Sequence, residues 1–231
     1  LMGPRARDIL SQVTPDDVSN AAFPFGTWRE IAIGGAIVRA LRITYVGELG
    51  WELHVPTEHA LAVYRLLLAA GRDHGLANAG YRAIESLRLE KGYRAWGSDI
   101  GPDHTPLEAG LGWAVKLKSN LPFLGRDALM AQREQPLRKR LGCFTVEDPD
   151  VVLLGRETIY RDGQRVGWLT SGGWGYTLAT NIGYGYVRHG AGVDDAFLYD
   201  GGYELEVATE RVPCRIHREI LYDPKMERIK T

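Results

Sequence analysis

The sequence predicts an α+β protein in two parts, a mixed region over residues 1–136 and an all-β region over residues 137–231. Two patterns lead to this prediction. Apolar residues recur at helical spacing after Thr57, and six short strand-like runs, separated by turn signals, follow Pro136. A series of short strands of this kind is typical of a small antiparallel barrel or sandwich.

The mixed region is expected to combine short helices with half-buried strands. In chain order, the patterns predict a helix over 5–12, strands over 28–33 and 37–46, a helix that starts at Thr57 and ends before Gly75, a helix over 81–91, a strand over 111–117 and a helix over 125–133. Residues 93–110 form a long stretch rich in glycine, aspartate, proline and tryptophan. Long irregular loops in compact domains often carry function.

The all-β region lacks a good helical pattern. Its expected strands cover residues 140–146, 157–160, 166–170, 182–187, 203–208 and 211–217. The pair Asp162-Gly163 is a strong signal for a hairpin turn. The glycine-rich segment 171–176 is interpreted as a barrel turn rather than a phosphate loop, because no helix follows it to present backbone amides to an anion.

Composition argues against several classes of partner. The net charge is −1, so no electrostatic case for nucleic acid or an anionic membrane arises. Cys143 and Cys214 match no metal-binding spacing, and so few cysteines fit a reducing compartment. No dinucleotide fingerprint is present, and no apolar run approaches the ~18 residues of a membrane-spanning helix. The chain starts with LMGPRARDIL and no leader, so we expect it to be part of a longer protein.

The segment 42–56, RITYVGELGWELHVP, carries the most informative candidate site. It predicts a strand, a tight turn and a second strand, with Tyr45 and Glu52 seven residues apart and two glycines between them. A carboxylate placed there can accept two parallel hydrogen bonds from a planar pair of donors, as on a pterin, guanine or guanidinium group. A solvated carboxylate and a packed tyrosine would explain the same residues.

Two further motifs have both a structural and a functional interpretation. Glu85, Arg88 and Lys91 follow one another at i, i+3 spacing, which favours a solvated ion-pair face worth roughly a few tenths of a kcal/mol per pair. Trp113 ends the motif TPLEAGLGW and offers a flat wall on which a ligand could stack. A tryptophan in the core is an equally good interpretation of that position.

Taken together, four segments resemble one family. YVGELGWEL, SLRLEKGYRAWGSDI, TPLEAGLGW and FLGRDAL follow the pattern of the folate-binding aminomethyltransferase fold, which includes the glycine cleavage T-protein and the C-terminal part of sarcosine and dimethylglycine dehydrogenases. The resemblance covers nearly the whole chain, and GELGWEL, GYRAIESL and KGYRAW are most similar to the dehydrogenase branch. It implies a partial α/β folate-binding region followed by an antiparallel β-barrel.

The resemblance also implies roles for particular residues. In the family, a tyrosine and a glutamate at the positions of Tyr45 and Glu52 hold the pterin of tetrahydrofolate, and a tryptophan at the position of Trp113 lies beside the folate. T-protein has a folate-contacting arginine where this chain has Ile84, which leaves Arg82 as the nearest candidate. The family's catalytic aspartate belongs to a segment before the one that opens this chain, so no catalytic residue is assigned here.

The implied function is the tetrahydrofolate-binding part of an FAD-dependent sarcosine or dimethylglycine dehydrogenase, which passes a one-carbon unit to tetrahydrofolate. FAD is expected on an upstream domain of the same polypeptide or on a partner subunit, and the chain alone is expected to be inactive. The alternatives are a stand-alone aminomethyltransferase and a non-catalytic regulatory subunit that retains the fold, similar to that of pyruvate dehydrogenase phosphatase. A bacterial cytoplasm and the mitochondrial matrix fit equally well.

Overall fold

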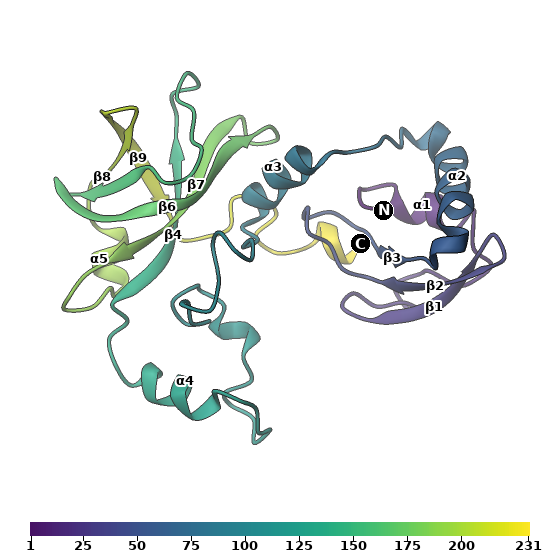
Figure 1. Ribbon diagram of the computed structural model, residues 1–231, viewed down its shortest axis with the longest axis horizontal. Coiled ribbons are helices and arrows are strands. Elements are labelled where there is room, and N and C mark those ends of the chain that lie inside the picture. Colours follow the sequence, from purple (N-terminus) through teal and green to yellow (C-terminus); the bar gives the residue numbers. More distant parts are fainter. The chain divides into compact units, whose positions relative to one another are not determined.

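The computed structural model describes residues 1–231 as two compact units (Figure 1). The first unit contains Leu1–Lys91 together with Tyr222–Thr231, and the second contains Gly92–Leu221. The chain therefore leaves the first unit after Lys91 and returns to it at Tyr222. No helix is both long enough and apolar enough to cross a membrane.

The first unit is a three-stranded antiparallel sheet with helices. Its helices are α1 (Ala6–Leu10), α2 (Ala60–Gly71) and α3 (Tyr81–Lys91), its strands are β1 (Trp28–Ile33), β2 (Ala36–Leu41) and β3 (Glu52–His54), and its 3-10 turns are Thr57–His59, Arg72–His74 and Arg228–Lys230. The strands lie in the order β1-β2-β3. The expected helix over 81–91 is confirmed to the residue.

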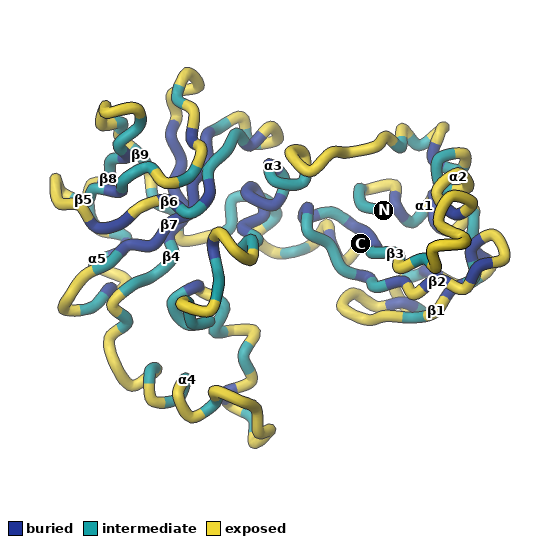
Figure 2. The backbone as a smooth tube through the Cα atoms, in the orientation of Figure 1, coloured by how far each residue is buried: buried dark blue, intermediate teal, exposed yellow.

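One face of this sheet is buried. Burial alternates along β1 and β2, as the period of two in a strand requires. Leu10 of α1 and Val63 of α2 belong to the same buried cluster as Ile31 and Val38 of the sheet. The two helices thus supply the apolar side chains that this face needs, and the buried stretches appear dark blue in Figure 2.

The expected hairpin over 42–56 is wrong in one respect. β2 ends at Leu41 rather than at residue 46, and ten irregular residues, 42–51, lead to β3 in place of a tight turn. The N–H of Ile43 donates to the carbonyl of Leu41, 3.0 Å away and only two residues back, which turns the chain out of the strand. Pairing resumes with Glu52, which lies opposite Leu41.

The second unit is built on a closed barrel. Its strands are β4 (Lys139–Val146), β5 (Thr158–Arg161), β6 (Gln164–Gly175), β7 (Thr180–Arg188), β8 (Tyr203–Val207) and β9 (Glu210–His217), in the barrel order β4-β7-β6-β5-β8-β9. The six expected strands and the antiparallel barrel are confirmed. All neighbours pair antiparallel, and apolar side chains such as Phe144, Leu169 and Leu205 fill the interior.

Three details of this unit differ from expectation. Residues 111–117 form no strand, because the N–H groups of Ala114 and Val115 bond to the carbonyls of Leu111 and Gly112, and the 3-10 turn Gly112–Ala114 results. Residues 171–175 continue β6 instead of forming a turn, paired with β7 as far as Gly175 opposite Thr180. A short helix, α5 (Asp195–Tyr199), follows β7, while α4 (Arg126–Arg133) lies where a helix was expected.

Candidate functional site

The first unit carries three of the four predicted site residues. Tyr45 lies half-buried in the 42–51 loop, and Glu52 opens β3 with 44% of its side chain exposed. Arg82 is the second residue of α3 and is exposed, without a hydrogen bond or ion pair. Trp113 belongs to the second unit, where 77% of its surface is exposed, so the alternative of a core tryptophan is wrong.

Glu52 retains its capacity to accept hydrogen bonds. The imidazole Nε2 of His54 lies 3.8 Å from Oε2 of Glu52, beyond hydrogen-bond distance. No donor of the chain bonds to this carboxylate. An ionised carboxylate offers two oxygens and about four lone-pair sites, so Glu52 can accept a pair of parallel N–H donors from a ligand.

The 42–51 loop rests on a buried lysine. Gly47 has φ +78°, and a Cβ at this position would lie 2.8 Å from Cδ of Lys91. Only glycine combines that conformation with such a close approach. The side chain of Lys91 is itself fully buried, and its Nζ lies 2.9 Å from Oδ2 of Asp223 and 2.6 Å from the carbonyl of Asp223.

This arrangement corrects the expectation of a solvated ion-pair face on α3. Arg88 is 2% exposed and bonds to Oε2 of Glu85 at 2.8 Å, while Lys91 pairs outside the helix with Asp223. The charged side chains of Arg88 and Lys91, near the C-terminal end of α3, are therefore buried. Removing one partner of a buried pair leaves an uncompensated charge, which makes these pairs structural constraints of the first unit.

Electrostatics around Asp223 and Tyr222 follow from this burial. Burial alone raises the pKa of the Asp223 carboxyl, but hydrogen bonds from Lys91 and from the N–H of Glu227 outweigh it and hold the pKa below its usual value. Burial, followed by the neighbouring carboxylate of Glu48, raises the pKa of Tyr222 to about 12. At neutral pH the Tyr222 hydroxyl is thus a hydrogen-bond donor, and it donates to Glu48.

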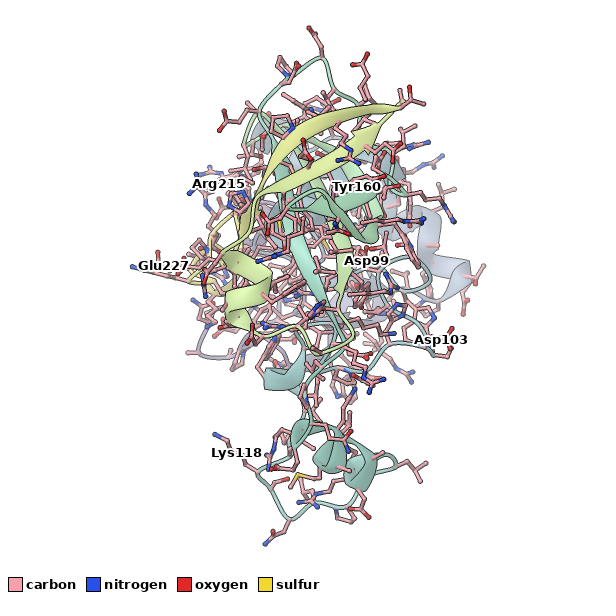
Figure 3. The ribbon with its side chains drawn as sticks, turned by 90° about the vertical axis from the view of Figure 1, so that its left-hand side faces the viewer. Asp99, Asp103, Lys118, Tyr160, Arg215 and Glu227 are labelled. Atoms are coloured by element: carbon pink, nitrogen blue, oxygen red, sulfur yellow. The ribbon has the colours of Figure 1, made fainter.

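In the second unit, a buried aspartate is among the residues that bond the long loop 93–110 to the barrel. Asp99 is fully buried, and its Oδ1 accepts hydrogen bonds from the hydroxyls of Ser171 and Thr170, both at 2.6 Å. Its Oδ2 accepts from the N–H of Ala95, and its carbonyl accepts from the Tyr186 hydroxyl. Figure 3 shows Asp99 among the barrel strands. The sequence indicated a functional loop here, but nothing in its pattern identified Asp99.

A cavity of about 200 Å³ lies in the second unit between that loop and the barrel. Cys143, Tyr184 and His217 line it, and burial raises the pKa of the Cys143 thiol to about 12 and lowers that of His217. Pockets for drug-sized ligands measure roughly 300–1,000 Å³. The cavity is therefore too small to enclose a folate-sized molecule by itself.

Comparison with known proteins identifies the fold. Residues 1–119 match the family model described as the GCVT N-terminal domain, and residues 139–223 match the glycine cleavage T-protein C-terminal barrel domain. The chain belongs to the glycine cleavage T-protein family. The resemblance drawn from four sequence segments is thereby confirmed.

Relatives within the T-protein family include longer proteins. The chain is 49% identical to mitochondrial sarcosine dehydrogenase of Mus musculus, covering 100% of the chain and 25% of that protein. It is 40% identical to mitochondrial dimethylglycine dehydrogenase of Mus musculus, covering 99% of the chain and 26% of that protein. The chain thus spans about a quarter of the length of these relatives.

A solved structure of the T-protein family has the same fold. The glycine cleavage system aminomethyltransferase T from Bartonella henselae superposes with a TM-score of 0.70 at 26% identity, over 81% of this chain and 50% of that one. This likeness confirms the predicted aminomethyltransferase fold with its C-terminal barrel.

Proposed function

We propose that these residues form the tetrahydrofolate-binding part of an FAD-dependent dehydrogenase of N-methyl amines. The observation that supports this most strongly is the match to sarcosine dehydrogenase over 100% of the chain. Glu52, with a half-exposed carboxylate that no donor of the chain uses, fits a ligand with two adjacent N–H groups. The pterin ring of tetrahydrofolate has such an edge.

In this proposal the chain binds and orients rather than oxidises. Glu52 accepts the two N–H groups of the pterin, Tyr45 contacts the ring from the loop, and Arg82 of the same unit is a further contact of the folate. Tetrahydrofolate, when bound, supplies the amine nitrogens that accept a one-carbon unit. The oxidation of the amine is assigned to an FAD-bearing domain outside these residues, in the same polypeptide or a partner subunit.

Placing the acceptor near the site of oxidation has a physical advantage. An iminium formed by removing hydride from an N-methyl amine hydrolyses readily in water and releases formaldehyde. A nucleophile held nearby reaches a high effective concentration and competes with water. Residues that orient the acceptor should therefore change the partition between transfer and release more than the rate of oxidation.

Product partition tests this function. The intact protein is supplied with sarcosine or dimethylglycine, tetrahydrofolate and an electron acceptor, and free formaldehyde is measured against methylene-tetrahydrofolate. We expect Glu52→Ala to raise the formaldehyde fraction while the rate of flavin reduction stays unchanged. Glu58→Ala, which removes an exposed carboxylate six residues away, is the matched control and should behave as wild type. An unchanged partition in Glu52→Ala would contradict the assignment.

A stand-alone aminomethyltransferase is the second candidate, favoured by the structural likeness to aminomethyltransferase T. This alternative needs folate but no flavin. The absorbance spectrum of the purified intact protein separates the two, because only the dehydrogenase is expected to show the bands of a bound flavin.

A further inference from the structure

The last ten residues of the chain belong to the first unit and contact the 42–51 loop. We call Tyr222–Thr231 the strap. The N–H of Tyr222 donates to the carbonyl of Glu90 at 3.1 Å, so the strap starts beside the end of α3. Its position is therefore set where the chain re-enters the first unit.

The strap bonds to the loop at two places. Nη2 of Arg42, the first loop residue, donates to the carbonyl of Thr231 at 2.9 Å, and Arg42 is 1% exposed. In the middle of the loop, Oε1 of Glu48 accepts from the hydroxyl of Tyr222 and lies 3.3 Å from Nη1 of Arg228. The loop is thereby held at its start and at its centre.

Lys91 contacts both the strap and the 42–51 loop. Its aliphatic carbons lie 2.8–3.1 Å from where a Cβ of Gly47 would be. All three oxygens that its Nζ contacts belong to Tyr222 and Asp223 of the strap. Lys91 therefore contacts Gly47 with its apolar stem and the strap with its charge. Tyr45 precedes Gly47 by two residues, so its backbone position depends on this support.

We propose that the strap clamps the 42–51 loop in its ligand-binding conformation, with Glu48, Lys91 and Tyr222 as positioning residues. None of the three is assigned a contact with the ligand. The inference rests on the proposed function, because it gives these residues a role in presenting Tyr45 and Glu52 to a folate. It predicts that weakening the clamp lowers folate affinity without changing either ligand-contacting residue.

Hydrogen exchange of the intact protein, combined with calorimetry using folinic acid, tests the clamp. Tyr222→Phe removes the hydroxyl that bonds to Glu48 and keeps the ring. We expect amides over residues 43–50 to exchange about tenfold faster, barrel amides to be unchanged, and folinic acid to bind about tenfold more weakly. Tyr176→Phe, at a tyrosine 79% exposed in the second unit, is the control and should change neither quantity.

Conservative variants distinguish positioning from general stability. Glu48→Gln keeps an acceptor oxygen for Tyr222 and should retain most of the affinity. Glu48→Ala should lose at least as much affinity as Tyr222→Phe, because it also removes the contact with Arg228. The double variant Glu48→Ala with Tyr222→Phe should bind no more weakly than Glu48→Ala alone, because Glu48→Ala already removes the contact that Tyr222→Phe removes.

The outcomes separate the clamp from the proposed function. Unchanged exchange over residues 43–50 in Tyr222→Phe overturns the clamp, and so does faster exchange spread over the whole first unit. Faster loop exchange with unchanged folinic acid affinity overturns the positioning role while the proposed function stands. A wild-type protein that fails to bind folinic acid overturns the proposed function, and loop exchange alone then decides whether the strap orders the loop.

Discussion

The ammonium of Lys91 lies 2.9 Å from the carboxylate of Asp223, in a site where the lysine side chain is fully buried and the aspartate side chain is 8% exposed. The two residues are 132 positions apart in the sequence. Their pairing joins the end of α3 to the strap, at the point where the chain leaves the first unit and returns to it.

Lys91→Ala should destabilise the first unit by about 3–5 kcal/mol, because it leaves the Asp223 carboxylate buried without its partner. Chemical denaturation followed by fluorescence measures the change. Lys118→Ala, at an exposed lysine of the second unit, is the control and should stay within about 0.5 kcal/mol of wild type. A Lys91→Ala protein as stable as wild type would show that the pair is not formed in solution.

The same pair should make stability depend on acid pH. The pKa of Asp223 in the folded state is below its unfolded value, so the folded state binds fewer protons there. This contribution is fully present above the unfolded pKa and is lost as pH falls through the folded pKa. In unfolding curves between pH 6 and pH 3, roughly spanning the usual aspartate range, Asp223→Asn should show a shallower loss of stability than wild type. Parallel curves would contradict the assigned shift.

Replacing Asp99 in the loop over 93–110 should also lower the stability of the second unit. Asp99→Ala leaves the hydroxyls of Ser171, which is buried, and Thr170 without their shared acceptor, at a cost of about 2–4 kcal/mol. Asp103→Ala removes an exposed carboxylate from the same loop and should cost less than about 0.5 kcal/mol. Thermal unfolding of the two variants compares these values directly, and equal losses would argue against the hydrogen-bond network at Asp99.

Cys143 should resist alkylation while the protein is folded. Burial raises the pKa of its thiol to about 12, so the reactive thiolate is scarce at pH 8. Peptide mapping after iodoacetamide treatment should find Cys143 unmodified in the native protein and modified after denaturation. Rapid native labelling would mean that the second unit opens more readily than the closed barrel suggests.

The sequence predicted well those features that depend on local pattern. Apolar periodicity and the glycine at position 92 gave the bounds of α3, and alternation with turn signals gave the six barrel strands. The features that it missed depend on distant partners. β2 ends where the buried side chain of Arg42 bonds to the carbonyls of Phe23 and Thr231. Spacing along α3 could not reveal that Lys91 bonds to the strap.

Other inferences remain predictions. The domain boundary at residue 136 is still a prediction. The folate-binding roles of Tyr45, Glu52, Arg82 and Trp113 are also still predictions. Spacing suggested that Tyr45 and Glu52 serve one site, and the structure places them on the same loop and the strand that follows it. The ligand itself lies beyond any pattern of apolar and polar residues, since a free carboxylate accepts donors from many molecules.

Calorimetric titration of the intact protein with folinic acid tests the central claim most directly. The account predicts that wild-type protein binds, that Glu52→Ala loses at least about tenfold in affinity with its thermal unfolding unchanged, and that Glu58→Ala binds as wild type. Equal affinity in wild type and Glu52→Ala, with both proteins folded, would contradict the assignment of this carboxylate to the pterin.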